Sequence, residues 1–395
     1  MKFFFTVIFF IPALFHVHSQ GIWTQKANFA GTGRTLGTGF SIWTKGYLGT
    51  GWDVTFKKDF WEYDRITNVW TQKANFGGVP RNQAVGFSIG TKGYIGTGNI
   101  SAYGSINDFW EYDPSTNIWT QKANVPGQMR NAAIGFSIGS KGYIGGGNYY
   151  ASNYWHNLND FWEYDPVSNI WTQKANLPGP VRQLGIGFSI SNKGYIGTGA
   201  DSSGYIYYQD IWEWDQVTNF WTQKANFPGG KRWGAYGFSI GNYGYVGMGD
   251  STYNIGSHIN DLWQFFPFTN TWKQVASYPG GTRSGPVGFS IGCQGFFGTG
   301  FDTTYNGTND FWEYIPDTLT AAVSVGNGTI CSGDSTSLYA FGGIHFLWST
   351  GDTTPFITVH PTVITTYSVL VSDNCGSNSA TTTILVNPSP SSFFN

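Results

Sequence analysis

The stretch from Trp70 to Tyr112 reads WTQKANFGGVPRNQAVGFSIGTKGYIGTGNISAYGSINDFWEY, and close copies of it recur along most of the chain. Three landmarks identify each copy: a Trp-Thr-Gln-Lys motif, an Arg followed six residues later by Phe-Ser-Ile, and an Asp-Phe-Trp-Glu-Tyr motif. The tryptophans that open the first landmark are 47 to 52 residues apart and lie at Trp23, Trp70, Trp119, Trp171, Trp221 and Trp272. Such a period predicts a repeat architecture in which each unit packs against the next.

Each copy predicts four short strands, because runs of aromatic and β-branched residues alternate with Gly, Asn, Asp and Pro. In the second copy we expect strands over residues 84–89, 94–97, 108–112 and 118–122. Six copies of four strands predict an all-β ring of sheets, a β-propeller, in which radial closure leaves only short protected edges.

The phase of the repeat makes a sharper prediction about how the ring closes. The first landmark begins with a lone fourth strand over residues 22–27, whereas the last copy stops after its third strand, residues 310–314. We therefore expect the N-terminal strand to complete the sixth sheet.

These repeats resemble the kelch repeat family, also called galactose-oxidase-like propellers. The resemblance rests on the glycines that end the second strand, the Tyr-Asp-Pro turn and the Trp that opens the fourth strand. The family's Gly-Gly pair appears here mostly as Gly-Thr-Gly, and residues 145–147 are the nearest literal match. The resemblance implies a six-bladed kelch-type propeller over residues 20–316.

The two ends of the chain carry different signals. Lys2, an apolar run over residues 3–15 and small residues before Gln20 predict a signal peptide over 1–19, so we expect a secreted or cell-surface protein. After the propeller, Ser/Thr/Val-rich alternation predicts a β-sandwich domain over 317–387 that resembles the immunoglobulin-like (Ig-like) modules of bacterial surface proteins. The tail, 388–395, is either a Ser/Pro end or the start of a truncated type IX secretion sorting domain.

The chain has three cysteines, Cys293, Cys331 and Cys375. Export to an oxidising compartment permits a disulfide between two of them. We expect the bond to join Cys331 to Cys375, because both lie in the C-terminal region, and we interpret Cys293 as a small buried side chain.

Composition excludes two classes of partner. Only 11% of the residues are charged and the formal net charge is −2, so no cluster of Lys and Arg is available to bind nucleic acid. Apart from the signal peptide, no segment approaches the ~20 apolar residues that a membrane-spanning helix requires. The sequence does not predict an oligomeric state.

Few residues suggest chemistry, and we expect no catalytic residue, no metal and no cofactor. A galactose oxidase needs a copper site made of Tyr, His and a Tyr-Cys crosslink, whereas Cys293 lies in a turn opposite the loops that carry His156 and His258. The alternative is a sugar mutarotase or epimerase, because a sialic-acid mutarotase also uses a six-bladed kelch ring. Such an enzyme needs acid and base groups near the channel mouth, but the Arg and Glu candidates recur in every copy.

The loops that join second to third strands differ between copies and combine aromatic residues with Asn, Asp, Ser and Gly. Rigid aromatics among small polar residues suit the recognition of sugars or protein surfaces, although the same rings could instead cap the sheets. The candidate ligand-binding residues are Trp52, Tyr103, Tyr150, Tyr154, Trp155, Tyr207, Tyr208, Tyr253 and Tyr305. We therefore expect a non-enzymatic module that binds a glycan or a protein; a structural role in a surface layer is a further alternative.

Overall fold

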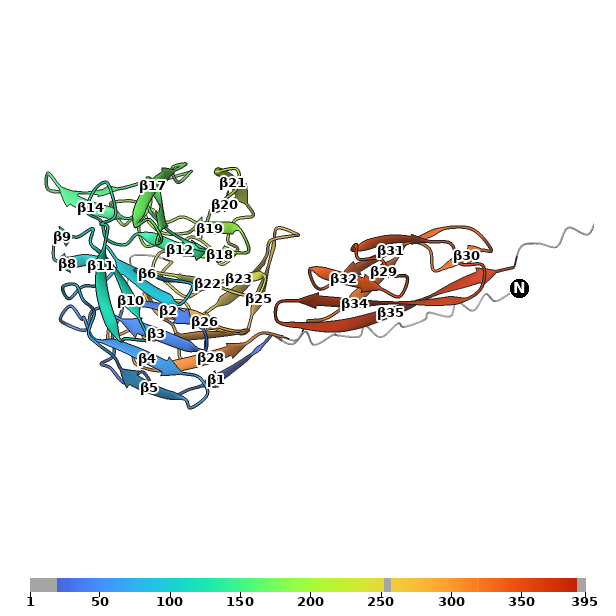
Figure 1. The fold of residues 1–395 in the computed structure, drawn as a ribbon, viewed down its shortest axis with the longest axis horizontal. Helices are drawn as coiled ribbons and strands as arrows, with labels where there is room; N and C mark the ends of the chain where they lie inside the picture. Colours follow the sequence, from blue (N-terminus) through green and yellow to red (C-terminus); the bar gives the residue numbers. More distant parts are fainter. Residues whose placement is uncertain (1–19, 252–256, 318, 389–395) are drawn as a thin grey trace, which may run out of the picture.

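A computed structural model describes residues 20–251, 257–317 and 319–388. The predicted signal peptide, Tyr253 and residues 389–395 of the predicted tail lie outside the described residues. Within these ranges every regular element is a β-strand, and there is no helix that is long and apolar enough to cross a membrane. The strands form a ring of sheets and an elongated C-terminal domain, residues 319–388 (Figure 1).

The described part of residues 20–317 holds six four-stranded antiparallel sheets, each built in the same way. The first strands are β2 (Thr38–Ile42), β6 (Val85–Ile89), β12 (Ile134–Ile138), β18 (Ile186–Ile190), β22 (Tyr236–Ile240) and β26 (Val287–Ile291). The second strands are β3 (Lys45–Gly49), β7 (Lys92–Gly96), β13 (Lys141–Gly145), β19 (Lys193–Gly197), β23 (Tyr243–Gly247) and β27 (Gln294–Gly298).

The outer half of each sheet follows the same order. The third strands are β4 (Phe60–Asp64), β10 (Phe109–Asp113), β16 (Phe161–Asp165), β20 (Ile211–Asp215), β24 (Leu262–Phe266) and β28 (Phe311–Ile315). The fourth strands are β5 (Val69–Gln72), β11 (Ile118–Lys122), β17 (Ile170–Lys174), β21 (Phe220–Lys224), β25 (Thr271–Val275) and, for the last sheet, β1 (Ile22–Gln25).

The sheets stand around a common centre in a propeller-like arrangement. Each first strand contacts the first strands of its two neighbours, and β26 contacts β2, so the ring is closed. A phenylalanine of each first strand packs against a glycine of the next sheet, as the ring of Phe40 does against Gly93 and that of Phe289 does against Gly46. Any side chain at these glycines would clash with the ring, which explains why this Phe and this Gly recur together in all six sheets.

β1 supplies the fourth strand of the last sheet. It pairs antiparallel with β28, so that Trp23 lies opposite Tyr314, as the phase of the repeat predicts. The Trp23 indole donates a hydrogen bond to the carbonyl of Ala276, and Lys26 forms an ion pair with Glu313. The two ends of the ring are thereby tied together.

A buried ion pair fixes each sheet from inside. Arg81 is fully buried, donates to both carboxylate oxygens of Asp108 and also reaches the carbonyl of Thr97. The indole of Trp110 donates to the same carboxylate over 2.9 Å. The equivalent pairs are Arg34–Asp59, Arg130–Asp160, Arg182–Asp210, Arg232–Asp261 and Arg283–Asp310. Because a buried charge needs a partner, the repeated Arg and Asp are structural.

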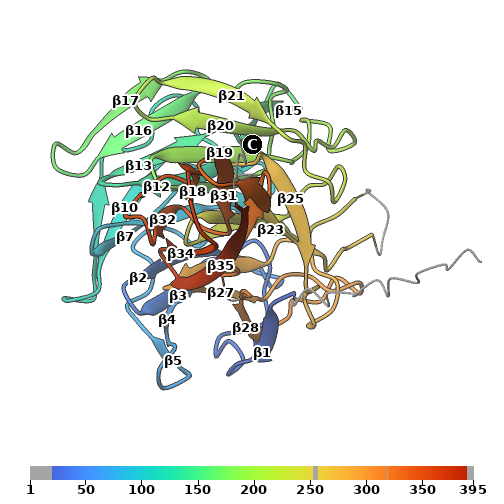
Figure 2. The ribbon, with the colours of Figure 1, turned by 90° about the vertical axis from the view of Figure 1, so that its right-hand side faces the viewer.

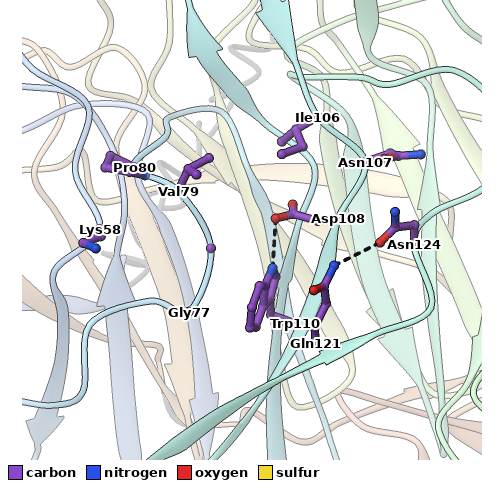
Figure 3. A pocket seen from close by; sticks show the side chains of 11 residues that line it. Lys58, Gly77, Val79, Pro80, Ile106, Asn107, Asp108, Trp110, Gln121 and Asn124 are labelled. Carbon is purple, nitrogen blue, oxygen red and sulfur yellow. Dashed lines mark hydrogen bonds between the residues drawn. The ribbon is translucent and has the colours of Figure 1, made fainter.

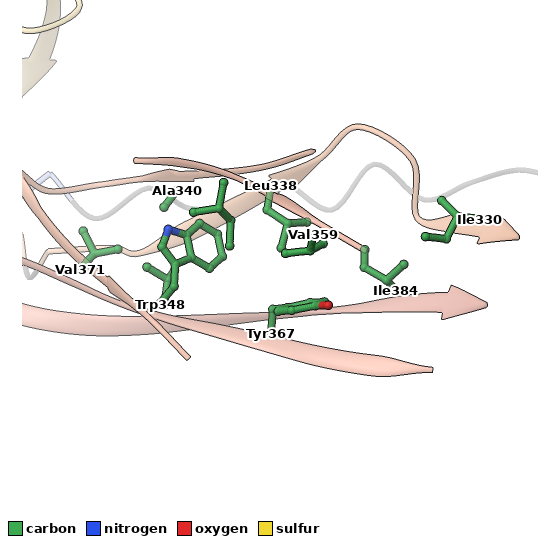
Figure 4. Packing of buried hydrophobic residues seen from close by; sticks show 10 residues of the cluster. Ile330, Leu338, Ala340, Trp348, Val359, Tyr367, Val371 and Ile384 are labelled. Atoms are coloured by element: carbon green, nitrogen blue, oxygen red, sulfur yellow. The ribbon is translucent and has the colours of Figure 1, made fainter. Parts of the chain in front are cut away.

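The C-terminal domain has its own core between two sheets, in the orders β29-β31-β33 and β30-β35-β34-β32. Trp348 and Leu338 lie at the centre of this core (Figure 4). The strands are β29 (Ala322–Val325), β30 (Thr329–Cys331), β31 (Thr336–Phe341), β32 (His345–Trp348), β33 (Phe356–Val359), β34 (Thr365–Asp373) and β35 (Gly376–Asn387).

The predicted pairing of Cys331 with Cys375 is wrong, and so is the interpretation of Cys293 as a free buried residue. The disulfide joins Cys293 to Cys375, and Cys331 is exposed. Cys331 lies beside Asn387 at the far end of β35, whereas Cys375 lies at the tip of the β34–β35 hairpin. At ~3.3 Å per residue the two cysteines are roughly 35 Å apart, which no disulfide can span.

The disulfide fastens the hairpin tip to the ring. Asn374 in the tip donates a hydrogen bond to the side chain of Asn242, in the turn between β22 and β23. Cys293 itself lies in the turn between β26 and β27. The C-terminal domain therefore projects from one face of the ring (Figures 1 and 2).

Candidate functional site

The ring has two different faces. The turns that join first to second strands lie on one face, which we call the turn face, and the C-terminal domain is attached there. The connections from second to third strands lie on the opposite face, which we call the loop face. In Figure 1 the loop-face strands β8 (Asn99–Ser101), β9 (Gly104–Ser105) and β14 (Asn148–Ala151) lie at the end of the ring farthest from the C-terminal domain. The loop face is the one that the C-terminal domain leaves uncovered.

Two hairpins of the loop face bring three predicted residues together. Tyr103 lies in the turn between β8 and β9, while Tyr150 and Trp155 face each other across β14 and β15 (Tyr154–Asn157). The centroids of the Tyr103 and Tyr150 rings are 4.4 Å apart, and those of Tyr150 and Trp155 are 5.3 Å apart. Tyr103 is 62% exposed. We call Tyr103, Tyr150 and Trp155 the aromatic platform.

Residues around the platform extend its polar and aromatic character. Tyr154, at the end of the β14–β15 turn, is 71% exposed. Tyr149 stacks against the ring of His156 with centroids 5.2 Å apart. The side chain of Asn131, which precedes β12 of the third sheet, donates a hydrogen bond to the hydroxyl of Ser105 in β9. This bond joins the β8–β9 hairpin to the third sheet. The platform is therefore held by neighbouring loops rather than by one hairpin alone.

A second group of predicted residues lies over the first and last sheets. Trp52 contacts the ring of Phe301, with centroids 5.8 Å apart, and Phe301 contacts Tyr305 at 5.9 Å. The imidazole ring of His258 also contacts the ring of Tyr305 edge to face, with centroids 5.5 Å apart. Sequence analysis did not single out Phe301 as a site residue and gave His258 no binding role, since neither lies in a motif that signals binding.

Tyr207 and Tyr208, two of the predicted ligand-binding residues, both contact other groups of the protein. Tyr207 is only 8% exposed, so its ring contributes to the packing of the loop. The ring of Tyr208 lies against the guanidinium of Arg182, 5.2 Å from its central carbon. Tyr207 is thus packed inside its loop, whereas Tyr208 is half-buried against Arg182.

The loop-face carboxylates bind groups of the protein itself. Asp302 accepts hydrogen bonds from the hydroxyl and the amide of Thr304 and from the amide of Asn306, and these bonds lower the pKa of its carboxyl. Asp250 is buried between the imidazole of His258 and the hydroxyl of Ser284. Within the described residues, no three His, Cys, Asp or Glu side chains come together as a metal site.

A groove with a volume of about 610 Å³ opens between the first two sheets. Figure 3 shows its two walls: Lys58 and residues 77–80 form one, while Asp108, Trp110, Gln121 and Asn124 belong to the other. Gln121 donates a hydrogen bond to the side chain of Asn124. We call this cavity the Trp110 groove; sequence analysis did not predict it, because Trp110 belongs to a motif that recurs in every copy.

The centre of the ring offers a different, smaller cavity of about 100 Å³. Its lining residues come from all six repeats and are mainly small or apolar, such as Leu36, Ala132 and Pro286. Tyr236 is the lining residue that can ionise, and burial raises the pKa of its hydroxyl to about 12. The lining described here therefore holds neither an Asp or Glu base nor a His for acid and base catalysis near neutral pH.

Comparison with known proteins identifies a fold and no more. No protein-family model matches the chain, and no curated protein does. Among solved structures, that of YjhT is similar, with a TM-score of 0.62 and 16% sequence identity over 72% of this chain and 95% of YjhT. At this identity the likeness concerns the all-β, propeller-like fold alone.

Proposed function

We propose that the chain is a secreted or cell-surface binding protein in which a six-bladed kelch-type propeller engages a glycan or a protein through its loop face. In this proposal the C-terminal domain is an Ig-like spacer that holds the loop face away from its point of attachment. The repeated landmarks support the kelch assignment, and the two-sheet core around Trp348 supports the Ig-like one.

The aromatic platform is the observation that carries the proposal. Three rings from two hairpins contact one another on the face opposite the C-terminal domain. Tyr103 is exposed and Tyr150 and Trp155 are half-buried, so the three rings are held in place by one another at little entropic cost. Aromatic faces of this kind suit the apolar face of a sugar ring or a protein side chain. Aromatic residues of this kind dominate the binding energy at protein interfaces.

The alternative, a carbohydrate-active enzyme such as a sugar mutarotase or epimerase, requires ionisable groups where a sugar would react. The central cavity is small and its lining is mainly apolar. The repeated carboxylates lie in ion pairs such as Arg81–Asp108, so they serve the sheets. These observations favour binding over turnover.

A glycan array probed with the full chain and with a Tyr150→Ala/Trp155→Ala variant tests the proposal. We expect saturable binding that weakens about 30-fold in the variant, because central aromatic contacts are worth roughly 2 kcal/mol or more. The control is Phe268→Ala, since Phe268 is 79% exposed on the turn face. Unchanged affinity in the double variant would refute the platform, and an array without signal would leave a protein as the ligand of this proposal.

A further inference from the structure

The Trp110 groove lies between the first two sheets, where the chain departs from the repeat at two positions, Gly77 and Lys58. Each sheet is preceded by a connecting segment with a conserved order: a buried apolar residue, one variable residue, a glycine and, three residues later, the buried Arg. The variable residue is Ala30, Gly77, Pro126, Pro178, Pro228 or Pro279 in the six copies. At Gly77 a Cβ atom would lie 2.6 Å from the Trp110 ring, so a proline here would crowd the indole and fill part of the groove.

Lys58, on the same wall as Gly77 and across the groove from Trp110, is the second departure. The equivalent residues are Asn107, Asn159, Gln209, Asn260 and Asn309. Two of these amides hold the connecting segment: Asn107 donates to the carbonyl of Val125 and Asn260 to that of Tyr278. A lysine cannot reproduce this amide geometry, and Lys58 instead lines the groove.

The charge of Lys58 is available to a ligand. Of the 13 lysines in the described residues, 11 form ion pairs with a carboxylate, and Lys58 and Lys231 do not. The carboxylate of Asp108 in the facing wall is neutralised by Arg81 and accepts a hydrogen bond from Trp110. The groove therefore presents one uncompensated positive charge.

The remaining lining suits a sugar ring. Trp110 is half-buried, and its bond to Asp108 fixes the orientation of the indole. Gln121 and Asn124 are exposed amides that offer both donors and acceptors, which is what the hydroxyls of a pyranose require. The volume of about 610 Å³ lies within the roughly 300–1,000 Å³ of small-molecule sites.

We propose that the Trp110 groove is a binding site for a hexuronic acid unit of an acidic glycan. The pyranose stacks on Trp110, its hydroxyls bond with Gln121 and Asn124, and its carboxylate pairs with Lys58. None of these residues belongs to the aromatic platform, so the site extends the proposed function without depending on the platform.

Calorimetric titration of the full chain with trigalacturonic acid and with neutral galactotriose tests this site. We expect the acidic trisaccharide to bind at least ~10-fold more tightly at low salt. Lys58→Asn restores the residue of the other repeats and is expected to remove this preference, while Lys231→Asn, the control at the other unpaired lysine, keeps it. Equal affinity for the two probes, absence of binding by both, or full preference in Lys58→Asn would overturn the proposal.

Two more variants separate this site from its surroundings. Gly77→Pro restores the residue of four other repeats, and we expect it to abolish binding of the acidic probe; if it fails to fold by circular dichroism, Lys58→Asn alone decides. The Tyr150→Ala/Trp155→Ala variant is expected to bind the acidic probe as the unaltered chain does. Loss of that binding in the platform variant would contradict a separate groove site, whatever the result of the glycan array.

Discussion

The first four sheets and the last two differ on the turn face. In each of the first four, a lysine at the start of the second strand pairs with an aspartate at the end of the third: Lys45–Asp64, Lys92–Asp113, Lys141–Asp165 and Lys193–Asp215. The fifth sheet has Tyr243 against Phe266 instead, with ring centroids 5.2 Å apart. The sixth has Gln294, which accepts a hydrogen bond from Arg65.

These departures gather where the C-terminal domain is attached. The turn of the fifth sheet holds Asn242, which bonds to Asn374, and the turn of the sixth holds Cys293, which bonds to Cys375. In a repeat protein, a residue that serves only its own sheet is repeated, and one that contacts something else is free to differ. Lys58 and Gly77 depart from the repeat in the same way on the loop-face side, which is why we interpret them as ligand contacts.

The largest expected effect comes from removing the closure of the sixth sheet. Deletion of residues 20–28 removes β1 and leaves β28 with an open edge. We expect the melting temperature of the ring to fall by at least ~10 °C, because closure joins every sheet to its neighbours. Ile22→Ser, at an exposed position of the same strand, is the control. An unchanged midpoint for the deletion in a thermal melt would refute the role of β1.

The buried arginines provide the next comparison. Arg81 is 0% exposed and contacts both oxygens of Asp108, whereas Arg283 is 7% exposed and donates one bond to Asp310. Arg81→Met is expected to cost about 3–5 kcal/mol of unfolding free energy, because it leaves a buried carboxylate unpaired. Arg283→Met is expected to cost less. If the two variants lost equal unfolding free energy in urea denaturation, the ion pair of the last sheet would contribute as much as that of the second.

The disulfide is expected to hold the C-terminal domain against the ring. The Cys293→Ser/Cys375→Ser variant removes a crosslink between residues 82 apart in sequence. Such a crosslink is worth about 2–4 kcal/mol. We expect faster proteolysis at residues 316–320 and a broader distance distribution in small-angle X-ray scattering. Cys331→Ser, which removes the exposed thiol, is the control, and identical scattering from all three proteins would contradict the inferred clamp.

The smallest effect concerns the turn-face ion pairs. The hydrogen bond from Lys45 and the amide of Ile66 lower the pKa of Asp64 to about 2. This pair therefore stabilises the fold above the unfolded pKa near 4 and loses its contribution as the pH falls through 2. Lys45→Met is expected to cost at most ~1 kcal/mol at pH 7 and to flatten the acid dependence.

Tyr243→Met makes the corresponding change in the fifth sheet, where the facing residue is Phe266. We expect this variant to leave the dependence of stability on pH between 2 and 5 unchanged. Acid titrations of the two variants followed by tryptophan fluorescence make the comparison. If the dependence of stability on pH became equally flat in both variants, the Lys45–Asp64 pair would not be the source of that dependence.

Much of the ring could be predicted because the landmark residues contact one another in the same way in each sheet. The Phe of each first strand requires the Gly of the next second strand, and Arg requires Asp, so the same residues recur wherever the same contacts do. The pairing of β1 with β28 follows from the phase alone. The disulfide could not be predicted from the position of Cys375 in the sequence, because its partner depends on where the β34–β35 hairpin points.

The site was less predictable, since residue type does not say where a ring points. Tyr150 and Tyr207 lie in similar loops, yet one contacts a neighbouring hairpin and the other is buried. The Trp110 groove left a signal in the sequence, the replacement of Pro by Gly77 and of Asn by Lys58. That signal acquires meaning only once the structure places the two residues on one wall of the groove, across from Trp110 (Figure 3).

The central claim is that the loop face binds and the turn face does not. Hydrogen–deuterium exchange of the full chain, alone and with the oligosaccharide that gives the strongest array signal, tests it most directly. Our account predicts slower exchange in residues 99–106 and 148–157, which carry the aromatic platform, and no change in the turns at 90–92 and 139–141. Protection confined to those turns or to residues 319–388 would contradict it.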